Sequence, residues 1–186
     1  ATTLMCRGAI PSDHRLNTGM IGMHGSNASN ILATKCDLII ALGARFSDRV
    51  ISDKEFINNA KVIQIDVDPA EVNKNVKVDS FIIGDIKVAL QRLMPLLNNK
   101  ENKEWLNTVD ELKLLSITKN NKDNGEELTP RFLFEKLSDM DSGDFIIATE
   151  VGQHQMWTAQ YFNFKTPRTL ISSGGLGTMG FGLGAA

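Results

Sequence analysis

Cysteine is scarce in this sequence, and its scarcity excludes several classes of small protein. The chain of 186 residues contains two cysteines, Cys6 and Cys36, which are too few for a disulfide framework and match no metal-ligand spacing. We expect each of them to be a small buried apolar residue rather than a reactive thiol. Such sparse use of cysteine is typical of a reducing compartment, and we therefore expect a cytoplasmic protein.

Long apolar runs and clusters of like charge are also missing. No apolar run approaches the roughly 20 residues that span a bilayer, so we expect no membrane partner. The 20 Lys and Arg residues are interspersed with 22 Asp and Glu residues, and the formal net charge is -2. This balance disfavours nucleic acid as a partner. A hydrophobic share of 42% is nevertheless enough for a full globular core.

Strand and helix patterns alternate along the chain. Short, continuously apolar runs are typical of parallel strands that are buried on both faces. They lie at residues 37–43, 60–67, 80–84 and 144–149. Apolar residues at helical spacing, or good capping residues such as Thr129 before Pro130, predict helices between them. These lie near residues 26–35, 86–97, 105–112 and 131–137. The alternation predicts an α/β fold with a parallel Rossmann-like sheet layered with helices, followed by the truncated start of a second α/β domain.

The two ends of the chain differ from those of a complete domain. Residues 1–5 are typical of a strand with no preceding element, and residues 180–186 of the first turns of a helix. We therefore expect both ends to be points at which a longer chain has been cut. The polar stretch 119–127 is the best linker candidate, and we expect a domain boundary near residues 116–128.

Two glycine-containing segments of the first half have features of phosphate sites. Residues 19–30 (GMIGMHGSNASN) place three glycines ahead of a helix start, where backbone amides and the helix dipole attract an anion. Residues 43–50 (GARFSDRV) place Arg45 and Arg49 just past a predicted strand, and forked guanidinium groups suit pyrophosphate. For residues 19–30 the alternative is a flexible turn with helix caps. For residues 43–50 the alternative is an ion pair on the solvated surface.

Acidic residues and a glycine end the next two predicted strands. Asp66 and Asp68 follow one strand, and Gly84 with Asp85 follows the other. An acid in this position can accept hydrogen bonds from ribose hydroxyls, whereas helix capping is the alternative for Asp68 and Asp85. Taken together, the ends of three successive strands favour an extended dinucleotide at the edge of the sheet.

The second half of the chain contains two further segments of this kind. Residues 150–157 (EVGQHQMW) place His154 in a strand-to-helix turn, where a phosphate can be held; a structural histidine is the alternative. Residues 172–182 (SSGGLGTMGFG) are dense in glycine, which implies that the backbone approaches a ligand or another chain closely. The interleaved Leu176, Met179 and Phe181 are expected to be buried.

These segments, in this order, resemble the acetohydroxyacid synthase (acetolactate synthase) family of thiamine-diphosphate-dependent enzymes. The resemblance is carried by GMIGMHG, LGARFSDRV, IQIDVDPAEVNKN, VGQHQMW and SSGGLGTMGFGLGAA. It implies that residues 1–100 are the second half of a central FAD-binding domain. It also implies that residues 101–128 are an interdomain helix and linker, and that residues 129–186 begin the thiamine-pyrophosphate-binding domain.

The resemblance also implies which residues bind cofactors. FAD is expected at His24, Gly25, Gly43, Arg45, Arg49, Asp66, Gly84 and Asp85. Thiamine diphosphate is expected at Val151, Gly152, Gln153 and His154 for the diphosphate, with Gly177 and Met179 around the aminopyrimidine. No catalytic residue and no metal ligand is expected in this chain. The activating glutamate is expected before its start, and the ligands of the Mg²⁺ cofactor after its end.

In this family, pyruvate is decarboxylated and its two-carbon unit is joined to a second 2-ketoacid for branched-chain amino acid biosynthesis. The resemblance implies 2-ketoacid substrates, a parent homodimer or tetramer and a possible regulatory subunit. It also implies that this piece is inactive alone and binds neither cofactor tightly. A related thiamine-diphosphate carboligase, a pyruvate oxidase and a non-catalytic nucleotide-binding module remain the alternatives.

Overall fold

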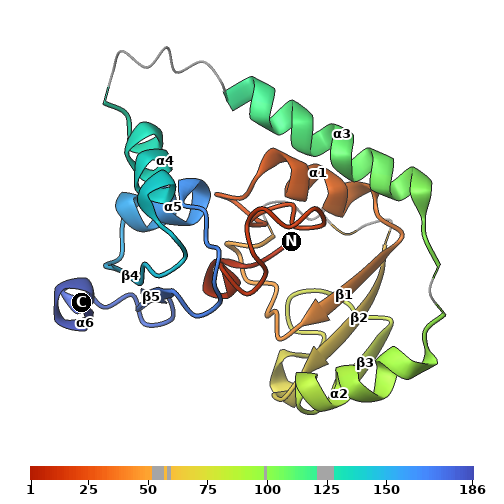
Figure 1. Ribbon diagram of the computed structural model, residues 1–186. Coiled ribbons are helices and arrows are strands. Elements are labelled where there is room, and N and C mark those ends of the chain that lie inside the picture. Colours follow the sequence, from red (N-terminus) through yellow and green to blue (C-terminus); the bar gives the residue numbers. More distant parts are fainter. Residues whose placement is uncertain (52–56, 58–59, 99, 121–127) are drawn as a thin grey trace. The chain divides into compact units, whose positions relative to one another are not determined.

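A computed structural model describes residues 1–51, 57, 60–98, 100–120 and 128–186 of the chain (Figure 1). These residues form two compact units, one of residues 1–29 with 109–186 and one of residues 30–108. Each unit contains parallel strands that are layered with helices, so the fold is α/β, as predicted. The described part of the chain contains no helix that is long and apolar enough to cross a membrane.

The helices and strands follow the predicted order closely. The strands are β1 (Leu38–Leu42), β2 (Lys61–Asp66), β3 (Ser80–Ile83), β4 (Ile147–Thr149) and β5 (Leu170–Ser172). The α-helices are α1 (Asn27–Lys35), α2 (Ile86–Leu93), α3 (Lys103–Asn120), α4 (Pro130–Met140), α5 (Gln153–Tyr161) and α6 (Phe181–Ala185). Short 3-10 helices are η1 (Leu4–Cys6), η3 (Pro69–Glu71) and η4 (Met94–Leu96). The four strands predicted from apolar runs are confirmed, and β5 is an addition.

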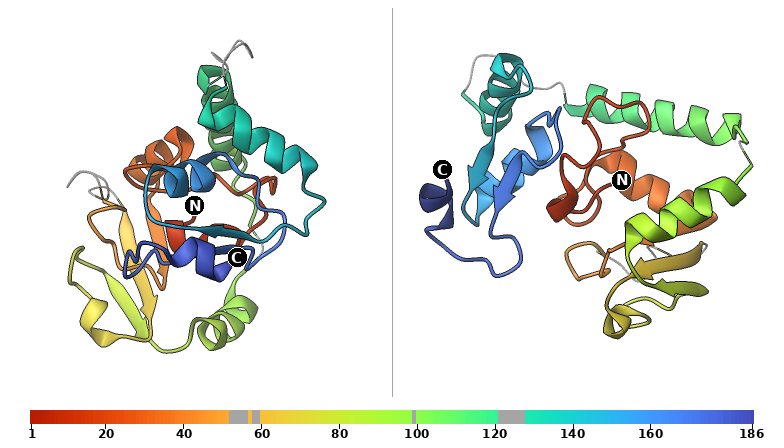
Figure 2. Two further views of the ribbon diagram at one scale, coloured as in Figure 1. Left: turned by 90° about the vertical axis from the view of Figure 1, so that its left-hand side faces the viewer. Right: turned by 60° about the horizontal axis from the view of Figure 1, so that its bottom comes forward.

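The unit of residues 30–108 is built on a parallel sheet with the strand order β1-β2-β3 (Figures 1 and 2). Leu38 pairs with Lys61 across the first interface, and Ile63 pairs with Ser80 across the second. The central strand β2 is the most buried, since Val62 is 1% and Ile65 0% exposed. Its apolar side chains therefore anchor the unit.

The predicted burial of strands on both faces is wrong for β1 and β3. Leu38, Ile40 and Leu42 alternate along β1 and are all exposed, and every residue of β3 is exposed. Strand β3 lies at an edge of the sheet. The buried cluster of this unit consists of Ala41, Phe46 and Val62, and it includes none of the exposed residues of β1 and β3. A parallel sheet is normally covered on both faces, but the described residues of this unit leave the apolar side chains of β1 and β3 named above exposed.

The other unit contains the parallel pair β4–β5, in register from Ile147 opposite Leu170 to Thr149 opposite Ser172. Helix α4 packs against α5, and α6 packs against both strands (Figure 2). Phe162 and Phe164, just after α5, are 1% and 0% exposed, and their ring centroids lie 5.0 Å apart. This aromatic pair is the most deeply buried apolar material of the unit.

Polar side chains fix the start and the packing of α4. The hydroxyl of Thr129 accepts a hydrogen bond from the amide of Phe132 at 3.1 Å, so the predicted N-cap is confirmed. The buried hydroxyl of Ser138 donates to the carbonyl of Phe134 and accepts from the amide of Asn163, at 2.7 and 2.9 Å. The second bond joins α4 to the segment that follows α5.

Three further expectations from the sequence are corrected or lie outside the described residues. Residues 1–5 form a single bridge, Thr2 with Met20, and then η1, so the predicted strand there is wrong. Cys6 is exposed and Cys36 is half-buried, so the expected burial fails for Cys6. Of the predicted linker 119–127, residues 121–127 lie outside the described residues.

Asp141 stabilises the turn that leads from α4 into β4. It is 4% exposed, and its Oδ1 atom accepts hydrogen bonds from the amides of Gly143, Asp144 and Phe145 at 2.8, 3.0 and 3.0 Å. Burial alone acts to raise the pKa of this carboxyl, but the three amides and the charge of Lys165 outweigh it, so the pKa lies below its ordinary value. The folded chain therefore favours the ionised carboxylate.

We predict that Asp141→Asn lowers the free energy of unfolding at pH 7 by about 1–2 kcal/mol, because amide hydrogen bonds to a charged acceptor are lost. A carboxyl group whose pKa is lower in the folded state stabilises the fold at pH values above its unfolded pKa, which is about 4. This contribution disappears as the pH falls through the pKa of the folded state. The difference between the two proteins should therefore shrink between pH 7 and pH 3 in urea titrations.

Asp139→Asn is the matched control, since this α4 side chain is 72% exposed and lies 3.6 Å from Lys136. Its effect should stay within about 0.5 kcal/mol. A deficit of Asp141→Asn that is the same at pH 7 and pH 3 contradicts a role for the charge.

Candidate functional site

The two segments predicted to bind thiamine diphosphate lie at one edge of the β4–β5 sheet. Because the strands are parallel and in register, both end at the same edge. Residues 150–152 connect β4 to α5, and residues 173–180 connect β5 to α6. The fold thus brings Val151, Gly152, Gln153 and His154 to the same edge as Gly177 and Met179.

Helix α5 begins without a side-chain cap. Its N-cap residue is Gly152, which adopts φ 152° and offers no oxygen to the first amides of the helix. Both Gln153 and His154 are exposed at this first turn. Uncapped amides at a helix N-terminus form an electropositive site that favours an anion. Glycine at the N-cap position also adds no side chain over these amides.

Glu150 ties the two segments together. Its Oε2 atom accepts a hydrogen bond from the amide of Gly180 at 2.5 Å. A Cβ atom on Gly182 would lie 2.9 Å from the amide nitrogen of Glu150, so only glycine permits this approach of α6 to the end of β4. Sequence reasoning treated Glu150 only as the start of a motif and missed this contact.

The glycine-dense segment is ordered by its own backbone. The carbonyl of Ser173 accepts from the amide of Gly177 at 2.7 Å, and its hydroxyl accepts from the amide of Thr178 at 3.1 Å. Gly177 and Gly180 adopt φ values of 66° and 83°, which favour glycine. The segment is thus a defined turn rather than a featureless loop.

The expected burial of the apolar residues in this segment is wrong for two of the three. Leu176 is 93% and Met179 is 82% exposed, whereas Phe181 is half-buried. No described residue of this unit covers the first two side chains. Large apolar side chains exposed beside a polar turn are typical of a surface that contacts a ligand or another chain.

The hydroxyl of Ser172, which is half-buried, anchors α5 to the sheet. Ser172, the last residue of β5, accepts hydrogen bonds on Oγ from Gln155 of α5 at 2.6 Å and from Thr149 of β4 at 3.0 Å. Gln155 and Thr149 are 3% and 4% exposed. This network fixes the first turn of α5 relative to both strands, and no motif in the sequence predicted it.

In the unit of residues 30–108, most of the residues assigned to FAD lie at the carboxyl edge of the sheet. The amide of Gly43 donates to the carbonyl of Ile65, and that of Gly84 to Asp66, at 2.8 and 2.9 Å. No atom lies within 4 Å of a Cβ placed on Gly84, so a ligand can approach the backbone there. Gly43, Asp66 and Gly84 thus belong to one continuous edge.

The acids at this edge are partly engaged. Asp85 accepts from the amide of Val88 at 3.0 Å and caps α2, and Asp68 accepts from Ala70 at 2.9 Å ahead of η3, so the capping alternative is confirmed for both. Asp66 is 7% exposed, and its Oδ1 atom accepts from the amide of Asp68 at 3.0 Å. Each acid retains one oxygen for which no hydrogen bond occurs among the described residues.

The two arginines after β1 are exposed. The carbonyl of Arg45 accepts from the side chain of Asn75 at 2.9 Å, which holds its backbone while the guanidinium extends from the unit. The intervening Phe46 adopts φ 48° and is 6% exposed, so it buries its ring and turns its neighbours outward. Arg45 is therefore placed for contact with an external group.

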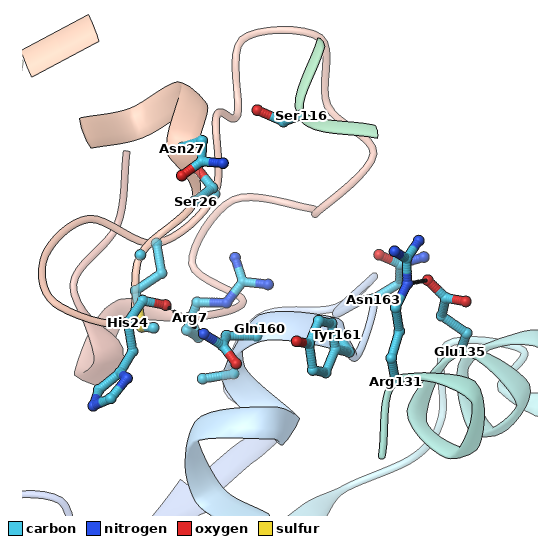
Figure 3. A pocket seen from close by; sticks show the side chains of 14 residues that line it. Arg7, His24, Ser26, Asn27, Ser116, Arg131, Glu135, Gln160, Tyr161 and Asn163 are labelled. Carbon is cyan, nitrogen blue, oxygen red and sulfur yellow. Dashed lines mark hydrogen bonds and ion pairs between the residues drawn. The ribbon is translucent and has the colours of Figure 1, made fainter. Parts of the chain in front are cut away.

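His24 and Gly25 belong to the other unit, where they line a cavity of about 360 Å³ (Figure 3). The carbonyl of His24 accepts from the side chain of Gln160 at 3.0 Å. A Cβ on Gly25 would lie 2.5 Å from the carbonyl oxygen of Met20, so this position requires glycine. The cavity also contains Arg7 and Arg131, which sequence reasoning missed because neither belongs to a glycine motif.

Two family descriptions of known proteins match parts of this chain. Residues 1–93 match the family described as thiamine pyrophosphate enzyme, central domain. Residues 150–186, which contain the β4–β5 edge, match the thiamine pyrophosphate enzyme, C-terminal TPP binding domain.

Individual relatives match over the whole chain. The chain is 48% identical to the probable acetolactate synthase large subunit of Methanocaldococcus jannaschii, 45% to acetolactate synthase 1, chloroplastic, of Oryza sativa subsp. japonica, and 44% to the acetolactate synthase large subunit of Lactococcus lactis. Each match covers the whole of this chain, but only 33%, 30% and 32% of the length of the respective relative. The chain therefore spans about a third of their length. The chain belongs to the thiamine pyrophosphate enzyme family.

Proposed function

We propose that this chain is part of an acetolactate synthase large subunit. The whole enzyme would condense two pyruvate molecules, or pyruvate and 2-ketobutyrate, with decarboxylation in branched-chain amino acid biosynthesis. The observation that supports this proposal most strongly is the 44–48% identity, across all of this chain, to proteins that bear the name acetolactate synthase. The isolated chain is inactive in this proposal, since it corresponds to about a third of such a protein.

In the proposed enzyme, the β4–β5 edge holds thiamine diphosphate. The uncapped amides at the start of α5 support binding of the diphosphate by Val151, Gly152, Gln153 and His154. The turn around Gly177 and the exposed Met179 would contact the aminopyrimidine. Bound thiamine diphosphate supplies the carbon nucleophile and the electron sink for decarboxylation, so this chain contributes binding and orientation.

The proposal assigns further tasks to Glu150 and Ser172. The carboxylate of Glu150 accepts a hydrogen bond from the amide of Gly180 and so holds the glycine-dense turn in place. Ser172 holds the first turn of α5 through Gln155. Both contacts preorganise the edge before a cofactor binds, which lowers the entropic cost of binding.

FAD is proposed to bind at the residues assigned from the resemblance. Exposed Arg45 and the open space at Gly84 support this site. So do the carboxyl oxygens of Asp66 and Asp85 that accept no hydrogen bond from a described residue. The Mg²⁺ cofactor would be held by residues outside this chain. We further propose a cytoplasmic homodimer or tetramer, a possible regulatory subunit, and the domain division at residues 1–100, 101–128 and 129–186.

We predict that this chain can replace the equivalent third of the acetolactate synthase large subunit of Lactococcus lactis. The chimera should form acetolactate from pyruvate when thiamine diphosphate, Mg²⁺ and FAD are supplied, because 44% identity preserves both proposed cofactor edges. Product is measured by mass spectrometry. Folded chimera that binds thiamine diphosphate and decarboxylates pyruvate without forming acetolactate would favour another carboligase or an oxidase, and would overturn the proposal.

Within that chimera, Gly152→Ala should raise the thiamine diphosphate concentration for half-maximal activity about tenfold. The backbone at φ 152° is strained for other residues, and the added Cβ would lie 3.2 Å from the His154 ring. Retention of FAD, followed by its absorbance, should not change.

Gly184→Ala serves as the control for this substitution. A Cβ at Gly184 meets no atom within 4 Å and its φ is not in the left-handed range, so cofactor dependence should match that of the unmodified chimera. If both substitutions leave the cofactor dependence unchanged, the diphosphate does not bind at the start of α5.

A further inference from the structure

The guanidinium group of Arg7 is a buried charge without a hydrogen-bonding partner among the described residues. The residue is 8% exposed, and its Nε atom is buried with no acceptor. Among the described residues, no hydrogen bond or ion pair reaches its guanidinium group. Burial lowers the pKa of Arg7 from its ordinary value, but such a group remains protonated in proteins. An unpaired charge of this kind is costly and is normally matched by an anion.

The position of Arg7 is fixed by the segment that follows it. Gly8 adopts φ 84°, and a Cβ there would lie 3.3 Å from Cβ of Phe164. Ser12 exchanges hydrogen bonds with Phe164, donating its amide to the carbonyl at 2.9 Å and accepting from the amide at 3.1 Å. The guanidinium carbon of Arg7 lies 5.5 Å from the Phe164 ring centroid. The arginine is therefore held rigidly.

The cavity of about 360 Å³ provides space for a partner (Figure 3). Its volume lies in the range of small-molecule sites. Figure 3 shows the guanidinium of Arg7 between the segment of Ser26 and Asn27, where α1 begins, and the segment of Gln160 and Tyr161. The start of α1 adds a partial positive charge to this wall.

The other charges of the cavity are already balanced. Nε of Arg131 donates to Oε1 of Glu135 at 2.6 Å, so this pair contributes no net charge. Ser116 donates its hydroxyl to the carbonyl of Leu112 within α3 at 2.9 Å. As far as the described residues show, the uncompensated charge in the lining is thus that of Arg7.

Stacking on Phe164 accounts for only part of this arrangement. A desolvated cation–π contact stabilises the charge of the guanidinium group. It satisfies the face of the guanidinium, whereas the N–H donors lie in its plane and need acceptors at its edge. The forked donors of arginine match the two oxygens of a carboxylate or a phosphate.

We propose that this cavity binds a small oxoanion, with the guanidinium of Arg7 as its principal ligand at the amino-terminal end of α1. The occupant is a phosphate or carboxylate group, either free or part of a larger metabolite. The site does not depend on the proposed enzymatic function, since none of the residues assigned to thiamine diphosphate lines it. His24 and Gly25 do line it, so a phosphate of FAD is one source of the anion.

The test uses the 186-residue chain and inorganic phosphate, with chloride at equal ionic strength as the reference. Phosphate should bind saturably in ³¹P NMR titrations and raise the melting temperature. Arg7→Met should weaken binding at least about tenfold, and Arg7→Lys, which keeps the charge but not the fork, should weaken it less. Arg168→Met removes an equal charge from an exposed residue outside the cavity and should bind as the wild type does.

Stability separates anion binding from a structural role. Without phosphate, Arg7→Met should melt at or above the wild-type temperature, because a buried unpaired charge is removed; with phosphate, the wild type should become the more stable protein. A Met variant that is destabilised equally in both buffers shows that Arg7 only packs on Phe164 and overturns the proposal. Absence of saturable phosphate binding to the wild type, by NMR or melting temperature, overturns it as well.

Competition identifies the source of the anion. Acetate and pyruvate test a carboxylate, and FAD tests a cofactor phosphate, each added to the phosphate-bound chain. Displacement by pyruvate at lower concentration than acetate assigns the site to a ketoacid carboxylate. Displacement of phosphate by FAD assigns the site to that cofactor. If neither the carboxylates nor FAD displace phosphate, free phosphate is supported as the occupant.

Discussion

The parallel pairing of β4 with β5 is the constraint on which the candidate site depends. Two residues of a chain that are far apart in sequence, Gly152 and Gly180, reach one edge because both strands end there. Glu150 then fixes the separation of the two turns through the amide of Gly180. In an antiparallel pair the same turns would lie at opposite ends of the sheet. The chemistry of this edge therefore follows from the direction of the strands.

Local signals in the sequence were sufficient to predict much of the fold. Thr129 before Pro130 marked the start of α4, because a hydroxyl cap and a fixed proline φ act within one turn. The apolar runs of β1, β2 and β3 identified the sheet, and the glycines after β1 and β3 identified its carboxyl edge. These features depend on neighbours close in sequence, which is why pattern reasoning found them.

Other features depend on contacts that a pattern does not encode. Strand β5 has only three residues, Leu170–Ser172, and an apolar run that short is not distinctive. The exposure of Ile40 in β1 reflects what covers the sheet, whereas hydrophobicity alone predicts burial. In the sequence, Arg7 is distinguished only as a basic residue in the otherwise apolar segment 4–10. Its burial against Phe164 and its place in the cavity depend on residues that are far away in the sequence.

The central claim is that backbone amides at the β4–β5 edge bind the diphosphate of thiamine diphosphate. Hydrogen–deuterium exchange of the Lactococcus chimera, with and without the cofactor, tests it most directly. The account predicts slower exchange at the amides of Gln153 and His154, because these donors lie uncapped at the start of α5. Unchanged exchange at both amides, with the cofactor bound and protection elsewhere in the protein, would contradict it.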